Sequence, residues 1–173
     1  MIKLITIFWI IIGILSYYYI FIKPWVIHFK NLKNQYEQKS YNDMYNIHPS
    51  DFEHHIKDLL EISGYGSGTV SSYVNDFGVD VHLPNAVVQV KKYKCTSKVG
   101  RPELMKLEAA RTYFKKEKAI FVTLSFYTSS AIDYAKKINM QLIDFNDIMN
   151  MKGNMPNLTD YQSIHQKIAK GFI

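Results

Sequence analysis

The feature that most constrains this chain is a run of 19 residues without a charge, residues 4–22, LITIFWIIIGILSYYYIFI. As an α-helix rising about 1.5 Å per residue, the run is roughly 28 Å long, close to the hydrocarbon thickness of a bilayer. Three tyrosines at 17–19 and Trp25 lie at its far end, where a membrane interface favours aromatic rings. The run therefore predicts one transmembrane helix at residues 1–22.

A cleaved signal peptide and a buried core helix are the alternatives. The apolar part of a signal peptide is about 7 to 15 residues long and ends at a small-residue cleavage site. Here the run is longer and leads into KPWVIHFK without such a site, which favours an uncleaved anchor.

The charges that flank the run predict its orientation. Four lysines follow it within residues 23–39, whereas Lys3 and the amino terminus precede it. Because positive flanks tend to stay in the cytoplasm, we expect a single-pass membrane protein whose C-terminal part is cytoplasmic. The one cysteine, Cys95, fits a reducing compartment.

Three further segments follow the anchor. Residues 23–46 are polar and lack a clean apolar period, which is typical of a juxtamembrane linker. Residues 47–150 carry the periodic patterns of a folded domain, and residues 151–173 form a polar tail to which we assign no function. The length of 173 residues fits one globular domain with appendages.

Within residues 47–150 the apolar periods predict an α/β domain. A first helix has Ser50 as N-cap, Glu53 three residues later and Gly64 as its stop. Strands are predicted at 69–74, 78–83, 86–93, 118–125 and 140–145, and helices at 101–117, 128–139 (capped by Thr128 or Ser129) and 145–150. The order of helix, three-strand meander, helix, strand, helix and strand predicts a mixed β-sheet with helices on both faces.

Polar residues interrupt two neighbouring strands of the meander. Because side chains alternate along a strand, Gln89 and Lys91 share one face of VVQVKKYK. A hairpin that is symmetric about residues 84–85 places Asp80 directly opposite Gln89, with Lys91 within reach as a diagonal neighbour. We therefore expect Asp80, Gln89 and Lys91 to converge at one point of the sheet.

This trio has a chemical use. A carboxylate and an amide oxygen are hard ligands for Mg²⁺ (or Mn²⁺), and Glu53 of the first helix is the candidate third ligand. Lys91 would orient or deprotonate an attacking water, or neutralise developing charge. Each residue also has a structural alternative: Glu53 as half of a capping box, Asp80 as a polar strand residue and Lys91 as a solvated lysine.

The charges of the domain are separated along the chain. Residues 47–90 hold one lysine against six acids, whereas residues 91–118 hold ten basic residues against three acids. The basic segment predicts contacts to a phosphate backbone, unless it is ordinary helix solvation. The predicted DNA-backbone contacts are Lys92, Lys94, Lys98 and Arg101, with Lys115, Lys116 and Lys118 as further basic residues.

Several ordered motifs over about residues 49–150 resemble the Mrr-type branch of the PD-(D/E)XK restriction-endonuclease-like nucleases. They are Phe52-Glu53, Gly64-Tyr65, Asp76-Phe77-Gly78-Val79-Asp80, Val88-Gln89-Val90-Lys91, FVTLSFYTSSAIDYA and LIDFNDI. The resemblance implies Mg²⁺-dependent hydrolysis of DNA phosphodiester bonds, with Asp80, Gln89 and Lys91 as the active-site core and Glu53 in support. Gln89 stands where many relatives carry an acid, which removes a negative charge and should weaken metal affinity. Phe77 stands where the family prefers glycine.

The resulting hypothesis is a membrane-anchored DNA endonuclease that acts in restriction or defence against foreign DNA. The first alternative is a non-catalytic DNA-binding or tethering module on the same fold. The second is a membrane interaction protein whose basic helix meets anionic lipid, and the third is a nuclease for branched DNA or RNA. The sequence leaves a homodimer open.

Overall fold

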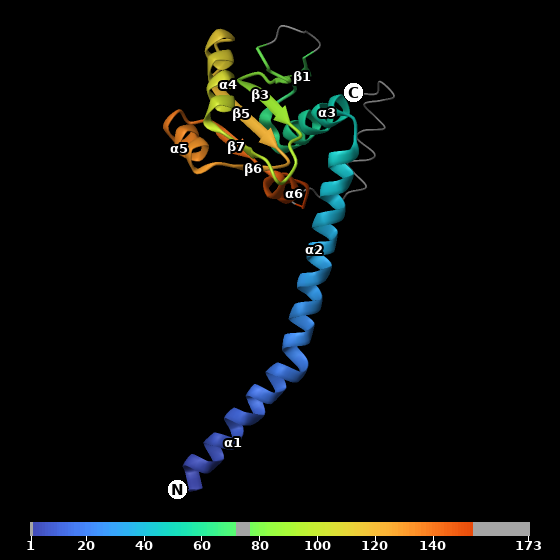
Figure 1. The fold of residues 1–173 in the computed structure, drawn as a ribbon, viewed down its shortest axis with the longest axis vertical. Helices are drawn as coiled ribbons and strands as arrows, with labels where there is room; N and C mark the ends of the chain where they lie inside the picture. Colours follow the sequence, from blue (N-terminus) through green and yellow to red (C-terminus); the bar gives the residue numbers. More distant parts are fainter. Residues whose placement is uncertain (1, 72–76, 154–173) are drawn as a thin grey trace. The chain divides into compact units, whose positions relative to one another are not determined.

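The computed structural model describes residues 2–71 and 77–153. The chain divides into two compact units, residues 1–44 and 45–173. In the first unit α1 (Ile2–Tyr17), the π-helical turn η1 (Tyr18–Ile22) and α2 (Lys23–Asn46) follow one another directly (Figure 1). The segment predicted as a polar linker is therefore helical.

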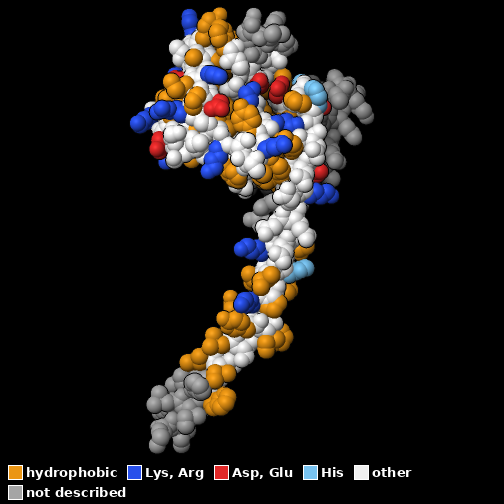
Figure 2. Space-filling model, in the orientation of Figure 1, with side chains coloured by type: hydrophobic (Ala, Val, Ile, Leu, Met, Phe, Trp, Pro, Cys, Tyr) orange, Lys and Arg blue, Asp and Glu red, His pale blue; other side chains and the backbone are white. Residues whose placement is uncertain are grey.

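One helix in the described part of the chain has the length and composition to cross a membrane, Trp9–Leu32, with a mean hydropathy of 1.7. Hydrophobic side chains are frequent along the lower part of this helix in Figure 2. Trp9, Tyr18 and Trp25 are all well exposed. A signal sequence or a core helix shares the same length and composition.

The second unit is an α/β domain in the predicted order. Its elements are α3 (Pro49–Leu60), η2 (Glu61–Tyr65), β1 (Thr69–Val70), β2 (Val81–His82), β3 (Ala86–Lys91), β4 (Lys98–Val99), α4 (Arg101–Tyr113), β5 (Lys118–Thr123), β6 (Phe126–Tyr127), α5 (Ser129–Lys137), β7 (Gln141–Ile143) and α6 (Phe145–Gly153). Residues 72–76 and 154–173 lie outside the described residues. They include the end of the strand predicted at 69–74, Asp76 and most of the polar tail.

The main sheet is mixed, as predicted. Its strand order is β1-β2-β3-β5-β7, with β1, β2 and β3 antiparallel to their neighbours in the meander and β3, β5 and β7 parallel. A second, small sheet pairs β4 with β6 in parallel. This small sheet was not predicted, because two-residue strands carry no periodic signal.

Helices cover both faces of the main sheet (Figure 1). Val87 and Phe121 point toward α4 and α5, where they join a buried cluster with Leu104, Leu107 and Ala131. Alternation turns the neighbouring strand residues, such as Val88, to the opposite face, on which α3 lies. There α3 buries Phe52, Ile56, Leu59 and Leu60.

The first turn of α3 differs from the prediction. His48, and not Ser50, is the N-cap: its Nδ1 accepts a hydrogen bond from the Ser50 N–H at 3.3 Å, and Pro49 opens the helix. The predicted capping box between Ser50 and Glu53 is therefore wrong. The predicted stop is confirmed, since Gly64 has φ +88°, which favours glycine.

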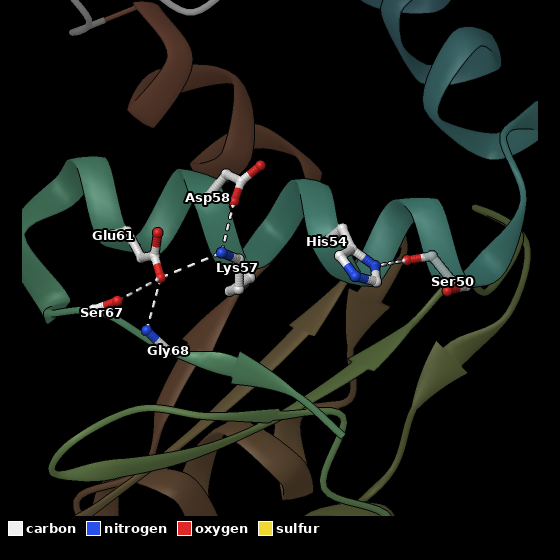
Figure 3. Close-up of polar contacts among 7 residues, drawn as sticks. All are labelled: Ser50, His54, Lys57, Asp58, Glu61, Ser67 and Gly68. Atoms are coloured by element: carbon white, nitrogen blue, oxygen red, sulfur yellow. Dashed lines mark hydrogen bonds and ion pairs between the residues drawn. The ribbon is translucent and has the colours of Figure 1, made fainter. Parts of the chain in front are cut away.

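The end of α3 is tied to the segment that leads into β1 (Figure 3). Glu61 Oε1 accepts a hydrogen bond from the Gly68 N–H at 2.7 Å and a longer one from the Ser67 hydroxyl at 3.4 Å. Lys57 lies 3.3 Å from the same oxygen and 3.0 Å from Asp58. These contacts fix the start of the meander against the first helix.

Candidate active site

The β2–β3 hairpin has the predicted register. Val81 pairs with Val88 and His82 with Val87, and the Leu83 N–H donates to the Ala86 carbonyl at 2.9 Å across the turn. The same register brings Asp80 opposite Gln89. A four-residue turn around a proline sets this register, because proline excludes the tighter two-residue hairpin loop.

Asp80 lies immediately before β2 begins, at the edge of the pairing between β2 and β3. Its N–H still donates to the Val88 carbonyl at 2.9 Å. The next amide of β3 that points the same way, Val90 N–H, donates instead to the Asp80 carboxylate oxygen Oδ2 at 2.6 Å. A charge-assisted bond of this length fixes the carboxylate at the edge of β3.

Lys91 completes this corner. Its ammonium nitrogen lies 3.7 Å from Asp80 Oδ2, and the two side chains are 34% and 16% exposed. The pair is thus partly open to solvent. We call Asp80, Gln89 and Lys91 the hairpin site.

Gln89 is the most enclosed member of the hairpin site. It is 7% exposed, and its carbonyl oxygen Oε1 is buried without a hydrogen-bond partner. Gly78, with φ +79°, covers its amide so closely that a Cβ there would lie 2.9 Å from Gln89 Nε2. A buried amide oxygen without a partner is costly, and functional sites are one setting in which such atoms occur.

Glu53 comes from a separate element. It lies half-buried on α3, beside the fully buried Phe52. The structure therefore joins Asp80 and Lys91 directly and sets Gln89 beside them through the hairpin register. Glu53 comes from the separate helix α3.

The donor set of this site suits a divalent cation. In residues 2–71 and 77–153, no three His, Cys, Asp or Glu side chains group as a metal site. Mg²⁺, however, needs few protein ligands because it keeps several waters. The Asp80 carboxylate and the unpartnered Gln89 Oε1 are hard oxygen donors, and Glu53 is the candidate third donor.

Four basic residues were predicted to contact a phosphate backbone. Lys94, Lys98 and Arg101 are exposed along the segment that leads from the end of β3 into β4 and α4. Lys92 is placed differently: its ammonium donates to the Ile47 carbonyl and lies 5.8 Å and 5.9 Å from the ring centroids of Tyr45 and Phe52. Desolvation lowers the pKa of Lys92.

Sequence reasoning missed a residue that holds the end of β3. Thr123, fully buried on β5, donates its hydroxyl to the Lys91 carbonyl at 2.8 Å and accepts from the Ser125 N–H at 3.1 Å. Its sequence signal was a polar residue inside the apolar strand KAIFVTLS. The hydrogen-bond partner of this hydroxyl is set by the parallel pairing of β3 with β5. The sequence does not show that pairing.

The domain is similar in sequence to known restriction endonucleases. A family model described as "Restriction endonuclease", Mrr_cat, matches residues 44–152. The type IV methyl-directed restriction enzyme EcoKMrr of Escherichia coli (strain K12) is 30% identical over 127 residues, which is 66% of this chain and 41% of the relative. The chain thus spans about two fifths of that relative's length.

Among solved structures, the DNA modification-dependent restriction endonuclease AspBHI is similar with a TM-score of 0.51 and 15% sequence identity. The match covers 79% of this chain and 40% of that chain. At this identity the likeness concerns the fold alone, and it agrees with a mixed sheet flanked by helices.

Proposed function

Because the chain belongs to the Mrr-type restriction endonuclease family, we propose that it hydrolyses DNA phosphodiester bonds at the hairpin site in a divalent-cation-dependent reaction. One observation carries this proposal: the Asp80 carboxylate and the Lys91 ammonium lie 3.7 Å apart, partly exposed, beside the enclosed Gln89. A carboxylate and an amide oxygen can hold a divalent cation, and a nearby ammonium can stabilise the charge that develops when water attacks a phosphodiester.

Each residue of the hairpin site has a role in the proposal. Asp80, fixed by the Val90 N–H, and Gln89, through its unpartnered Oε1, hold the cation, and Glu53 contributes from α3. Lys91 orients the attacking water and offsets the negative charge that grows on the phosphate in the transition state. A bound Mg²⁺ or Mn²⁺ supplies Lewis-acid stabilisation of the phosphate and lowers the pKa of a nearby water.

A cleavage assay tests the proposal. The full-length chain, purified in detergent, is incubated with supercoiled plasmid and either Mg²⁺, Mn²⁺ or EDTA, beside the variants Asp80→Asn and Lys91→Met. Exposed residues of α5 provide matched controls of the same charge, Asp133→Asn and Lys136→Met. We expect cleavage with divalent cations only, lost in the first two variants and kept in the controls.

The alternatives give different results in the same assay. Equal cleavage by all five proteins would remove the hairpin site from the mechanism. Salt-sensitive DNA binding without cleavage under either cation would support a non-catalytic tethering module. Preferred cleavage of RNA or of branched DNA in a substrate panel would redefine the substrate. Linear rather than nicked plasmid as the product would show that both strands are cut. The molecular mass of the protein in solution then tests whether a homodimer does so.

We further propose that residues 1–22 anchor the domain in a membrane with the C-terminal side in the cytoplasm. The support is the uncharged run of residues 4–22, whose side chains are exposed from Trp9 onward, and the four lysines that follow it. Cys95 is the one cysteine of the chain and is exposed, so it reports orientation. A membrane-impermeant maleimide should label it only after the cells are opened; labelling of intact cells would reverse the orientation, and release by alkaline carbonate would exclude the anchor.

A further inference from the structure

Two exposed aromatic rings contact each other, and one of them belongs to the turn that precedes Asp80. The ring centroids of Phe77 and Tyr113 lie 4.5 Å apart with their planes tilted by 41°. Phe77 is 58% exposed and Tyr113 is 64% exposed. Aromatic side chains of this size normally gain stability by burial, so a contacting pair that remains in solvent suggests a ligand.

The exposed pair rests on a third ring that is anchored in the core. Phe114 lies 6.2 Å from Phe77 and 5.1 Å from Tyr113, and it packs against the buried cluster beneath α4 and α5. His82 supports Phe114 from β2 at 4.8 Å. The two outer rings are thus mounted on a rigid base, as a stacking surface requires. We call Phe77 and Tyr113 the aromatic pair.

The backbone at Phe77 is unfavourable for a residue with a large side chain. Its φ is +56°, in the left-handed region that glycine and asparagine adopt more easily. A phenylalanine at this position pays conformational strain that a glycine would avoid. The backbone alone would favour glycine at position 77, so the phenylalanine ring itself must serve a purpose.

The position of the aromatic pair relates it to the proposed chemistry. Phe77 precedes Asp80 by three residues, so their Cα atoms are at most about 10 Å apart, the length of roughly three nucleotide steps in one strand. Along α4, Tyr113 lies about 18 Å from Arg101. Lys106, Lys115 and Lys118 are exposed on this helix and after it, and hydrophobic and basic side chains gather at this end of α4 in Figure 2.

We propose that the aromatic pair binds an unpaired nucleobase of the DNA strand whose phosphate lies at the hairpin site. Aromatic rings bind bases of any sequence by stacking, and nearby lysines neutralise the adjoining phosphates. Fully paired DNA keeps its bases inside the duplex, so the aromatic pair favours DNA with an unpaired base. This inference rests on the proposed function, because it assumes DNA as the substrate.

The test measures binding of the full-length chain in detergent, with EDTA to prevent cleavage. The probes are a paired duplex and the same duplex with one bulged 2-aminopurine, whose fluorescence falls when the base stacks. Phe77→Asn removes the ring but suits the left-handed backbone, and Tyr113→Ala removes the second ring. Phe77→Tyr keeps a ring, and Phe126→Ala removes an exposed ring, 45% exposed, on β6.

We expect the wild-type chain to bind the bulged duplex at least about fivefold more tightly than the paired one, with quenching of the probe. Phe77→Asn and Tyr113→Ala should lose this preference, while Phe77→Tyr and Phe126→Ala keep it. Thermal unfolding separates loss of the ring from loss of the fold, and either variant that stays folded suffices. Equal binding of both duplexes by wild type, or an unchanged preference in the two ring variants, overturns the inference and leaves cleavage intact. A chain that binds neither duplex overturns the proposed function as well.

Discussion

The Thr123 hydroxyl donates a hydrogen bond of 2.8 Å to the backbone carbonyl of Lys91. The two residues are paired across the parallel strands β3 and β5, and Thr123 is fully buried. A side chain of the core thus fixes the last residue of β3 at the point where its side chain meets Asp80. Lys91 owes its position to β5 as well as to its own strand.

Thr123→Val should therefore impair both stability and catalysis. The substitution leaves the Lys91 carbonyl and the Ser125 N–H without their partner in a buried place, at a cost of about 1–3 kcal/mol in the free energy of unfolding. If Thr123 positions Lys91, kcat should fall while KM for DNA changes little. Thr123→Ser keeps the hydroxyl and should restore kcat; a loss of stability with an unchanged kcat would limit Thr123 to a structural role.

Gly78→Ala should displace the Gln89 side chain. A Cβ at this position would lie 2.9 Å from Gln89 Nε2, and φ is +79°. Both the contact and the backbone oppose a side chain, so we expect a loss of about 1–3 kcal/mol in stability together with a loss of cleavage. Unfolding curves and plasmid cleavage measure the two effects. Phe77→Gly, in the same turn, relieves strain and should not destabilise the domain through its backbone.

Tyr127→Phe should change the alkaline stability of the domain. Burial raises the pKa of Tyr127 well above its usual value, and its hydroxyl lies 2.7 Å from the Phe121 carbonyl and 3.1 Å from that of Ile143. At neutral pH the variant should lose about 1 kcal/mol. Above about pH 10 the unfolded tyrosine ionises while the folded one keeps its proton, so wild-type stability falls with rising pH. Urea unfolding at pH 7 to 11 should show the difference between the two proteins shrinking; a constant difference would contradict this.

The hairpin was predictable in detail, and the local chemistry around it was not. A period of two, a proline in the turn and polar residues on one face fix the register that joins Asp80 to Gln89. The Asp80 carboxylate accepts a hydrogen bond from the Val90 N–H, and Gly78 lies against the Gln89 amide nitrogen. Both contacts depend on the path of the chain just before β2. The apolar periodicity of the sequence does not predict that path.

The first turn of α3 shows a different limit. Ser50 and Glu53 have the spacing of a capping box, yet His48 caps the helix because Pro49 provides a preformed first turn. Two candidate caps two residues apart would start the helix at different residues, and the sequence does not reveal which of them is used. As a consequence Ser50 is not the N-cap with which Glu53 was predicted to form a capping box.

Glu53→Gln tests the proposed role of Glu53 in metal binding. If its carboxylate helps to hold the cation, the Mg²⁺ concentration for half-maximal cleavage should rise about tenfold or more, and excess Mg²⁺ should restore much of the rate. Asp51→Asn, an exposed acid in the first turn of the same helix, is the matched control. An unchanged Mg²⁺ dependence in both variants would leave the cation to Asp80 and Gln89.

The basic residues after β3 make a prediction about salt. Each phosphate that a cation neutralises contributes about −0.9 to the slope of log K against log salt concentration. Replacing Lys94, Lys98 and Arg101 together by glutamine should therefore reduce the steepness of that slope by about 2.7, measured for a fixed duplex in EDTA. Lys92→Gln is the informative comparison, because the ammonium of Lys92 is bound to the Ile47 carbonyl and lies over two aromatic rings. It should leave the slope nearly unchanged and lower the unfolding temperature instead. If Lys92→Gln alone reduced the slope by about 0.9, Lys92 would leave the Ile47 carbonyl to bind a phosphate when DNA is present.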